Sequence, residues 1–291
     1  MTFAEGVVRG TGVIHDIGYQ RYTGPRLGRR HVFGSLYVHS LRAAFGLGRT
    51  AKAKIFPGFV VAVAFGVAVV GVAIRTQTGT VAVSYLQYVD GLGIPVLLFL
   101  AVVAPELVCR DLRAQVLPLY FSRPLRRSDY ALAKLAAMVS AVWLLLAGPL
   151  LVMFLGYAFA QTGGASGAWH EFTDYLGALG YATITAVVLG AVAVPLASLS
   201  TRRAVSAVII AGAFAVTTPV IGVLSAVGGT TAQRLAPLVN PIGMLNGLEA
   251  WIYRRDNLDI GGYGPLYLAA ALALVAGCVA ALVVRYRRVA A

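Results

Sequence analysis

Charged residues are scarce in this sequence of 291 residues, since they make up 12% of the chain against ~25% in typical globular proteins. Hydrophobic residues make up 59%, and the mean hydropathy is +0.79. A soluble fold cannot bury so large an apolar share, and several apolar runs exceed the ~18 residues that mark a membrane-spanning helix. The composition therefore excludes a soluble cytosolic enzyme and predicts an all-α membrane protein.

Cysteine is also scarce, because the chain has only Cys109 and Cys278. Two distant cysteines cannot form a disulfide framework, and no Cys/His group has the spacing of a zinc site. The phosphate-binding loop of ATPases requires a Gly-Lys pair, but Lys52, Lys54 and Lys134 each follow alanine. We therefore expect no catalytic residue, no metal and no cofactor in this chain.

Charges are missing from the middle of the apolar segments. Asp90, Glu106, Lys134 and Asp174 all fall near predicted span ends. Charged groups inside the membrane typically mark proton and ion pathways. Their absence argues against a proton-driven secondary transporter, whereas sodium coordination by the backbone of discontinuous helices stays compatible with the sequence.

Six apolar segments are each long enough to cross a ~30 Å hydrocarbon layer as a helix. Pro95, Pro149 and Pro219 fall inside three of them and predict kinks that neighbouring helices accommodate. The predicted spans are residues 55–74, 88–105, 130–160, 175–200, 204–227 and 265–284, within a transmembrane domain of residues 55–288.

The residues before the first span divide into two parts. Residues 1–30 are rich in Gly, Pro and Arg and lack helical periodicity, which predicts an irregular basic cytoplasmic arm. Residues 31–54 are predicted to form an amphipathic helix lying in the membrane interface, followed by a linker. Because a span follows at once, a helix packed on a soluble core fits less well. The apolar residues at helical spacing are Phe33, Leu36, Tyr37, Leu41, Ala44 and Phe45.

The distribution of basic residues predicts the orientation. No apolar core with a cleavage site follows Met1, so we expect no signal peptide and a cytoplasmic amino terminus. With six spans, 20 of the 24 Lys and Arg then lie on the cytoplasmic side, as the positive-inside rule requires. We predict a multi-pass protein of the cell (plasma) membrane with both termini cytoplasmic. Its net charge of +13 then sets topology and attracts membrane lipids, with no nucleic acid as partner.

Three outer loops follow from this topology, over residues 75–87, 161–173 and 228–264. The second is rich in glycine and is expected to be irregular. The third is too apolar for a free loop and too broken by Pro and Gly for a span. It is predicted to be a re-entrant or interfacial element, although an ordered loop packed on the bundle fits the sequence equally well.

The predicted cytoplasmic loop over residues 106–130 combines charged residues with an apolar stripe. Leu112, Val116, Leu119 and Tyr120 follow helical spacing, although the proline at 118 is expected to shorten or bend that helix. A solvated connector would expose the whole Leu-Pro-Leu-Tyr-Phe run to water. We therefore interpret the segment as a docking element.

This loop resembles the ABC-2-type permease family, the membrane subunits of bacterial ATP-binding-cassette exporters. In that family a Glu at the end of the second span is followed by basic residues, a Leu-rich coupling helix, a Ser-x-Pro step and a Lys that opens the third span. Pro118 departs from the usual coupling helix. The six-span layout, the amphipathic helix before the first span and the apolar element before the sixth span extend the resemblance to residues 31–288. The Ala-, Gly- and Arg-rich composition is typical of an actinobacterial member. The matching residues are Glu106, Arg110, Leu117, Leu119, Ser122, Arg123, Pro124, Arg126, Tyr130 and Lys134.

The resemblance implies a permease subunit of an exporter that couples to a separate cytoplasmic ABC ATPase subunit. It also implies a homodimer or a heterodimer with a second permease, and transport by alternating exposure. Two other functions stay open, a non-transporting membrane sensor or assembly subunit and a secondary transporter. The residues expected to bind the ATPase are Glu106, Arg110, Leu112, Arg113, Val116, Leu117, Leu119, Tyr120, Arg123 and Pro124.

Overall fold

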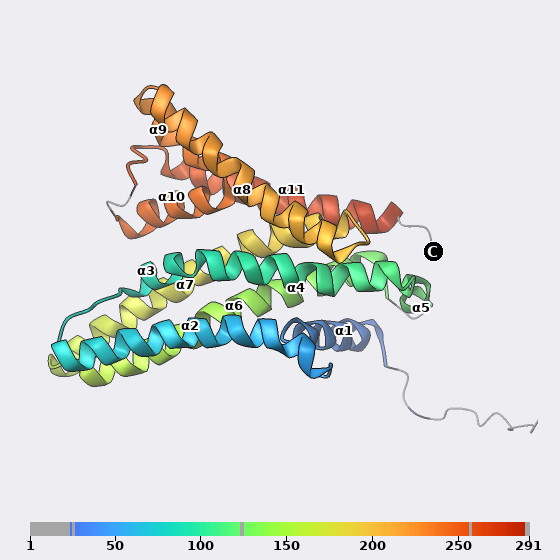
Figure 1. Ribbon diagram of the computed structural model, residues 1–291, viewed down its shortest axis with the longest axis horizontal. Coiled ribbons are helices and arrows are strands. Elements are labelled where there is room, and N and C mark those ends of the chain that lie inside the picture. The colour runs from blue at the N-terminus through green and yellow to red at the C-terminus, as the bar shows by residue number, and fades with distance from the viewer. Residues whose placement is uncertain (1–23, 25–26, 123–124, 256–257, 289–291) are drawn as a thin grey trace, which may run out of the picture.

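The computed structural model describes residues 24, 27–122, 125–255 and 258–288, so most of the predicted arm over residues 1–30 lies outside the described residues. The described part is all-helical (Figure 1). The long helices are α2 (Ala51–Thr78), α4 (Gly93–Arg113), α6 (Arg127–Ala160), α7 (Gly164–Ser198), α8 (Arg203–Val227) and α11 (Gly264–Arg288). The shorter ones are α1 (Arg29–Ala44), α3 (Tyr85–Gly91), α5 (Leu117–Phe121), α9 (Thr230–Leu235), the 3-10 helix η1 (Ala236–Val239) and α10 (Pro241–Tyr253).

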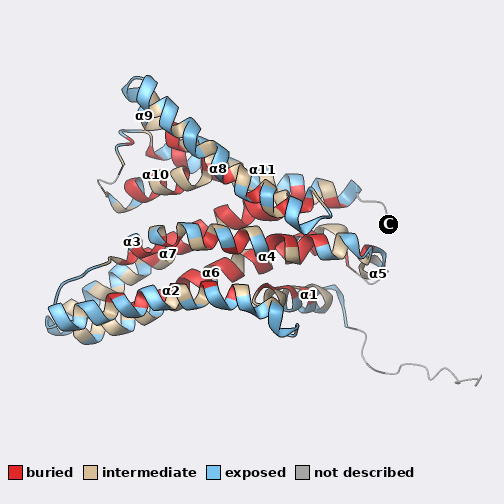
Figure 2. Ribbon diagram, viewed as in Figure 1, coloured by how far each residue is buried: buried red, intermediate tan, exposed pale blue. Residues whose placement is uncertain are grey.

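The six long helices are long and apolar enough to cross a membrane, which confirms the predicted number of spans. Helix α7 is central, because it contacts α3, α4, α6, α8, α10 and α11. In the most apolar stretch of α7 61% of the residues are buried, against 11% in α8 (Figure 2). The apolar outer faces of such helices suit lipid rather than water, as in a multi-pass membrane protein.

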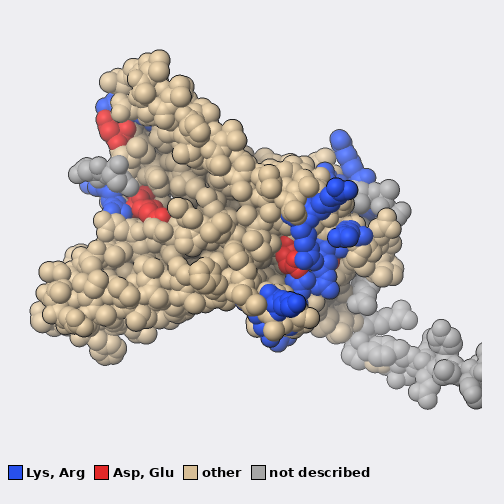
Figure 3. All heavy atoms as spheres, viewed as in Figure 1, with Lys and Arg blue, Asp and Glu red and all other residues tan. Residues whose placement is uncertain are grey.

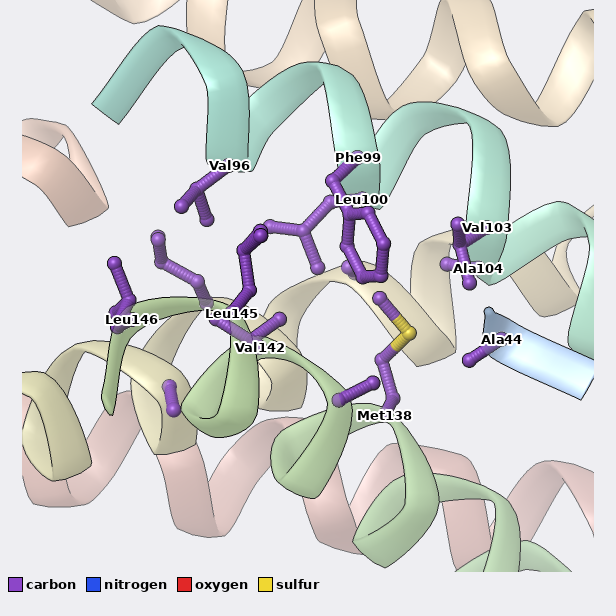
Figure 4. Close-up of a cluster of buried hydrophobic side chains, with 14 of the residues drawn as sticks. Ala44, Val96, Phe99, Leu100, Val103, Ala104, Met138, Val142, Leu145 and Leu146 are labelled. Carbon is purple, nitrogen blue, oxygen red and sulfur yellow. The ribbon is translucent and has the colours of Figure 1, made fainter. Parts of the chain in front are cut away.

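One part of the core lies where α4 and α6 face each other (Figure 4). Apolar residues recur at three- and four-residue steps on both helices and interdigitate, with Ala44 at the end of α1 closing one side. The facing residues are Val96, Phe99, Leu100 and Val103 from α4 and Met138, Val142, Leu145 and Leu146 from α6. This packing positions the end of α4 and the start of α6, and α5 lies in the connection between them.

Successive long helices run in opposite directions, so one end of the bundle carries α1, α5 and the last turn of α11 (Figure 1). Arg127 at the start of α6 donates to the carbonyl oxygen of Arg287 in α11 at 2.9 Å. Lys and Arg side chains gather at this end of the molecule (Figure 3). We call it the basic end, and the opposite end the far end.

The second predicted span, residues 88–105, differs from the helix observed. The chain breaks at Leu92 between α3 and α4, and α4 then continues past Pro105 to Arg113. Proline weakens a helix by removing one backbone donor, but Pro105 is buried among neighbouring helices whose packing holds α4 on both sides. Pro95, where a kink was predicted, lies in the first turn of α4, directly after the break at Leu92, so the interruption of the span coincides with the predicted kink.

The glycine-rich outer loop predicted over residues 161–173 is wrong, because α7 already begins at Gly164. Aromatic stacking explains the additional helical turns. The ring of Phe154 in α6 lies 4.8 Å from the ring of Tyr175 and 6.0 Å from that of Phe172. These contacts extend the hairpin of α6 and α7 beyond the predicted start of the fourth span.

Helix α1 lies in the segment of residues 31–54 that was predicted to hold an amphipathic helix and a linker, and α2 already begins within that linker. Leu36 and Ala44 of the predicted stripe are buried. The hydroxyl of Tyr37 donates to Ser140 Oγ in α6 at 2.9 Å. The apolar face of α1 therefore packs along α6, while its place in a membrane interface stays a prediction.

The segment over residues 228–264 is largely helical. Asn240 caps α10 with its side chain and donates from Nδ2 to the carbonyl oxygen of Phe214, halfway along α8, at 3.2 Å. At the other end of α10, Tyr253 donates to the carbonyl oxygen of Gly177 in α7 at 2.6 Å. The chain thus returns from the end of α8 to its middle and runs outward again. The segment is therefore ordered and packed on α7, α8 and α11, while its entry into the membrane stays a prediction.

Candidate partner-binding site

The predicted docking segment consists of two helices. Helix α4 ends at Arg113, and α5 begins at Leu117. Between them Gln115 adopts a left-handed conformation with φ of 49°, which terminates α4 and turns the chain. Pro118 occupies the first turn of α5, where its fixed φ suits a helix start. The helical spacing predicted across residues 106–120 is therefore interrupted at residues 114–116, and Pro118, which was expected to shorten or bend the helix, lies at the start of a second one.

The apolar residues of the segment divide between the core and the surface. Leu117 is buried, and Leu112 and Tyr120 are half-buried against the core. Leu119 is 70% exposed. Val116, half-buried, lines the groove described below. Among the side chains of the predicted stripe that the structure describes, Leu119 is the one that points mostly outward, while Leu112 and Tyr120 pack against the core.

The charged residues of the segment also have different roles. Arg110 and Arg113 are exposed at the end of α4. Glu106 forms ion pairs with Arg49, before α2, and with Arg203 Nη1, at the start of α8, the second at 2.5 Å. Glu106 thus joins three segments of the basic end rather than facing outward. The last two predicted contacts, Arg123 and Pro124, lie outside the described residues.

A groove of about 890 Å³ runs between α1 and the α4–α5 turn. Its walls combine apolar and basic side chains, and exposed Leu119 lies on its border. The wall from α1 includes His31, Val32, Leu36 and His39, and the wall from α4 and α5 includes Arg110, Val116, Leu119 and Tyr120. The groove has the size and mixed lining of a binding site.

A buried polar network connects α5 to the long helices. Lys134 Nζ of α6 lies 2.8 Å from Asp111 Oδ2 of α4, and the hydroxyl of Tyr130 donates to the same oxygen at 2.6 Å. The ring of Tyr130 lies 5.5 Å from that of Tyr120 in α5 and 5.3 Å from that of Tyr286 in α11. A displacement of α5 would therefore move residues of α4, α6 and α11 together, because Tyr130, in α6, contacts α4, α5 and α11.

Asp111 was missed by the sequence analysis, which singled out only Lys134. A detectable signal existed, because the two opposite charges lie near adjacent predicted span ends on the same side. Such a pair in a poorly solvated site requires mutual compensation. The sequence alone leaves open which acid pairs with Lys134, since Glu106 lies even closer than Asp111 to the end of the same predicted span.

Helix α1 is tied to the same end by a bidentate ion pair. Arg29 Nε and Nη2 each donate to a carboxylate oxygen of Asp129 at 2.5 Å. The hydrogen bonds to Asp129 raise the pKa of Arg29 above its ordinary value. The wall of the groove formed by α1 is therefore anchored at its first turn to the start of α6.

A second charged cluster lies at the far end and was not predicted. Asp90 of α3 accepts a hydrogen bond from Tyr181 at 2.9 Å, and its other oxygen lies 3.8 Å from Arg255 Nη1. Arg255 also pairs with Glu249 of α10, whose side chain is fully buried. Burial and the neighbouring charge of Glu249 raise the pKa of Asp90 to about 7. Asp90 lies outside the six candidate spans, so the cluster is a titratable site at the far end.

Comparison of the sequence with protein-family models found no match, and comparison with curated proteins found none either. The function proposed below therefore rests on the geometry of the basic end and on the residues of the α4–α6 connection.

Proposed function

We propose that this chain is the membrane-spanning permease subunit of an ATP-binding-cassette exporter, coupled through α5 to a separate cytoplasmic ATPase subunit. The supporting observation is the position of Leu119. It is 70% exposed on a five-residue helix outside the candidate spans, and it is backed by the network of Asp111, Tyr130 and Lys134. An exposed apolar anchor on a rigid base is typical of a docking residue.

The same network supports a coupling mechanism. When the two ATPase subunits close on ATP, they push on α5, and the ring of Tyr120 transmits the displacement to Tyr130. Because Tyr130 contacts Asp111 in α4 and Tyr286 in α11, three long helices shift together. The pathway between two permease chains, identical or related, would then open alternately to each side. The chain itself contributes no catalytic residue, and ATP is hydrolysed in the partner.

The proposed orientation places the basic end in the cytoplasm. The described residues there include the ion-paired Arg29, Arg49 and Arg203 and the exposed Arg110 and Arg113. Cytoplasmic loops of membrane proteins carry such an excess of basic residues. Helix α1 then lies at the cytoplasmic boundary of the membrane and forms one wall of the groove beside α5.

Co-purification tests the docking role. We expect Leu119→Asp to insert normally into the membrane but to lose an ATPase that purifies with the unmodified chain, together with ATP-driven transport. The aspartate would be a charge without a partner in the interface, which weakens binding by roughly 100-fold or more. Leu199→Asp is the matched control, because Leu199 is a 54% exposed leucine after α7 at the same end. Retention of the ATPase by Leu119→Asp, or equal loss in both variants, would contradict docking through α5.

The far-end cluster favours one alternative, a proton-coupled secondary transporter. Asp90 and the fully buried Glu249 are carboxylates of the kind that line proton pathways. Reconstitution of the purified chain alone separates the two functions. Uphill transport driven by a pH gradient without nucleotide would favour the secondary transporter, whereas the exporter subunit requires its ATPase. The sensor or assembly function predicts no transport even with the ATPase present.

A further inference from the structure

A second cavity, of about 970 Å³, lies at the basic end next to the groove beside α5, and His39 and Arg110 line both. It is bounded by the last turn of α1, the first turns of α2, the end of α4 and the start of α8. Five Lys or Arg residues line it, against the single carboxylate of Glu106: Arg42, Arg49, Lys52, Arg110 and Arg203. The proposed coupling mechanism does not use this cavity.

The lining retains positive charge after its internal ion pairs are counted. Glu106 is shared by Arg49 and Arg203. Among the residues that the structure describes, no carboxylate pairs with Arg42, Lys52 or Arg110. The cavity therefore favours an anion.

The walls of the cavity become apolar toward the middle of the bundle. Phe56, Pro57 and Val103 line it beside the basic residues. From there an exposed apolar stripe continues along α4 toward the far end, at four-residue spacing: Val102 is 44% exposed, Leu98 52% and Ile94 73%. Glu106 and Arg110 continue the same line into the cavity. Helix α4 runs between α2 and α8 in Figure 1, so that these two helices flank the stripe.

We propose that this cavity and stripe bind one anionic phospholipid, with its phosphate among Arg42, Lys52 and Arg110 and an acyl chain along Leu98 and Ile94. A cationic cavity continued by an apolar stripe matches an amphiphile with a negative headgroup. Basic pockets between membrane helices bind such headgroups. A soluble phosphate compound would use the basic residues alone and would make no contact with the stripe. The proposal goes beyond the exporter function and does not depend on it.

Binding to the purified full-length chain tests this site. Native mass spectrometry in detergent would compare dioleoyl phosphatidylglycerol with dioleoyl phosphatidylcholine, whose acyl chains are the same. We expect phosphatidylglycerol to bind about tenfold more tightly than phosphatidylcholine, or tighter still. The double variant Arg42→Gln/Lys52→Gln should lose most of this preference. Leu98→Gln should weaken phosphatidylglycerol binding severalfold through the stripe. All three substituted residues, Arg42, Lys52 and Leu98, lie at exposed positions, so the variants leave the core intact.

The matched control is Arg287→Gln/Arg288→Gln, which removes two exposed basic residues at the same end but outside the cavity. It should bind phosphatidylglycerol within about twofold of the unmodified chain. Equal weakening in both double variants would mean general attraction to a basic surface and would overturn the proposal. Equal affinity for the two lipids would overturn it as well. Inorganic phosphate that displaces phosphatidylglycerol at micromolar concentration would identify a soluble phosphate site instead.

Discussion

Lys134 and Asp111 show how a charged residue is accommodated inside this bundle. Their side chains are only 5% and 14% exposed, so each depends on the other for compensation. The pair Arg234–Asp259 at the far end is 39% and 72% exposed and is well solvated. Since removing one partner of a buried pair leaves an uncompensated charge, the two pairs should respond very differently to substitution.

We predict that Asp111→Asn lowers the free energy of unfolding by about 3–5 kcal/mol, because Lys134 then lacks its counter-charge. Asp259→Asn should have a much smaller effect, because both side chains of its ion pair are solvated. Asp111→Leu/Lys134→Met should recover most of the stability lost in the single variant. The measurement is unfolding in mixed detergent micelles. A loss at Asp111 no larger than that at Asp259 would show that Lys134 is solvated.

The far-end cluster predicts a pH dependence. The pKa of Asp90 is raised from 3.8 to about 7, so the folded protein holds this proton more tightly than the unfolded chain does. Its contribution to stability is complete below pH 3.8 and is lost as the pH rises to about 7. Glu249, Arg255 and Tyr181 face the same group.

We therefore predict that the melting temperature falls between pH 5 and pH 7 more steeply in the unmodified protein than in Asp90→Asn, because the variant lacks the ionising group. The melting curves would be recorded in detergent at fixed ionic strength. Asp259→Asn serves as the control, since Asp259 lies in an exposed pair at the same end. Identical pH profiles for the unmodified protein and Asp90→Asn would contradict the raised pKa.

At the scale of elements, α10 depends on close packing against α11. A Cβ atom placed on Gly247 would lie 2.2 Å from Cε1 of Tyr267, whose ring is fully buried. The hydroxyl of Tyr267 donates to the carbonyl oxygen of Arg234 at 2.7 Å, which restricts movement of the ring. A glycine at this position lets α10 approach α11.

Gly247→Val should therefore destabilise the protein by about 1–3 kcal/mol through overpacking. Gly222→Val is the matched control, because nothing lies within 4 Å of a Cβ at Gly222 in α8. Limited proteolysis would report whether the segment between α8 and α11 becomes accessible in the first variant. Equal protection of both variants would show that α10 tolerates a wider separation from α11.

At the scale of the whole molecule, the separation of charges between the ends predicts the topology. Native Cys109 is a poor reporter, because it is fully buried. In a chain carrying Cys109→Ser and Cys278→Ser, Ala114→Cys at the basic end should react with an impermeant thiol reagent only after the membrane is permeabilised. Thr162→Cys at the far end should react with an impermeant thiol reagent from outside. The reverse pattern would invert the proposed orientation.

Hydrophobic periodicity and length determined most of the helices. Spans such as residues 204–227 were predicted nearly to the residue, because a bilayer demands an uninterrupted apolar run. The predictions failed where packing overrides local composition. Pro105 continues α4, and the glycines near residue 164 begin α7, because contacts with neighbouring helices compensate for weak local propensity.

The sequence by itself determined the fold class, the number of spans and the segment that carries the candidate site. Which residues meet was decided by the tertiary structure. Asp111 pairs with Lys134, Glu106 joins two arginines, and Asp90 meets Glu249 across α3 and α10. A single sequence shows which face of a helix is apolar, but not which neighbour that face contacts. Charged residues far apart in the chain find their partners only when the helices pack, since a buried charge must be compensated by whatever lies beside it.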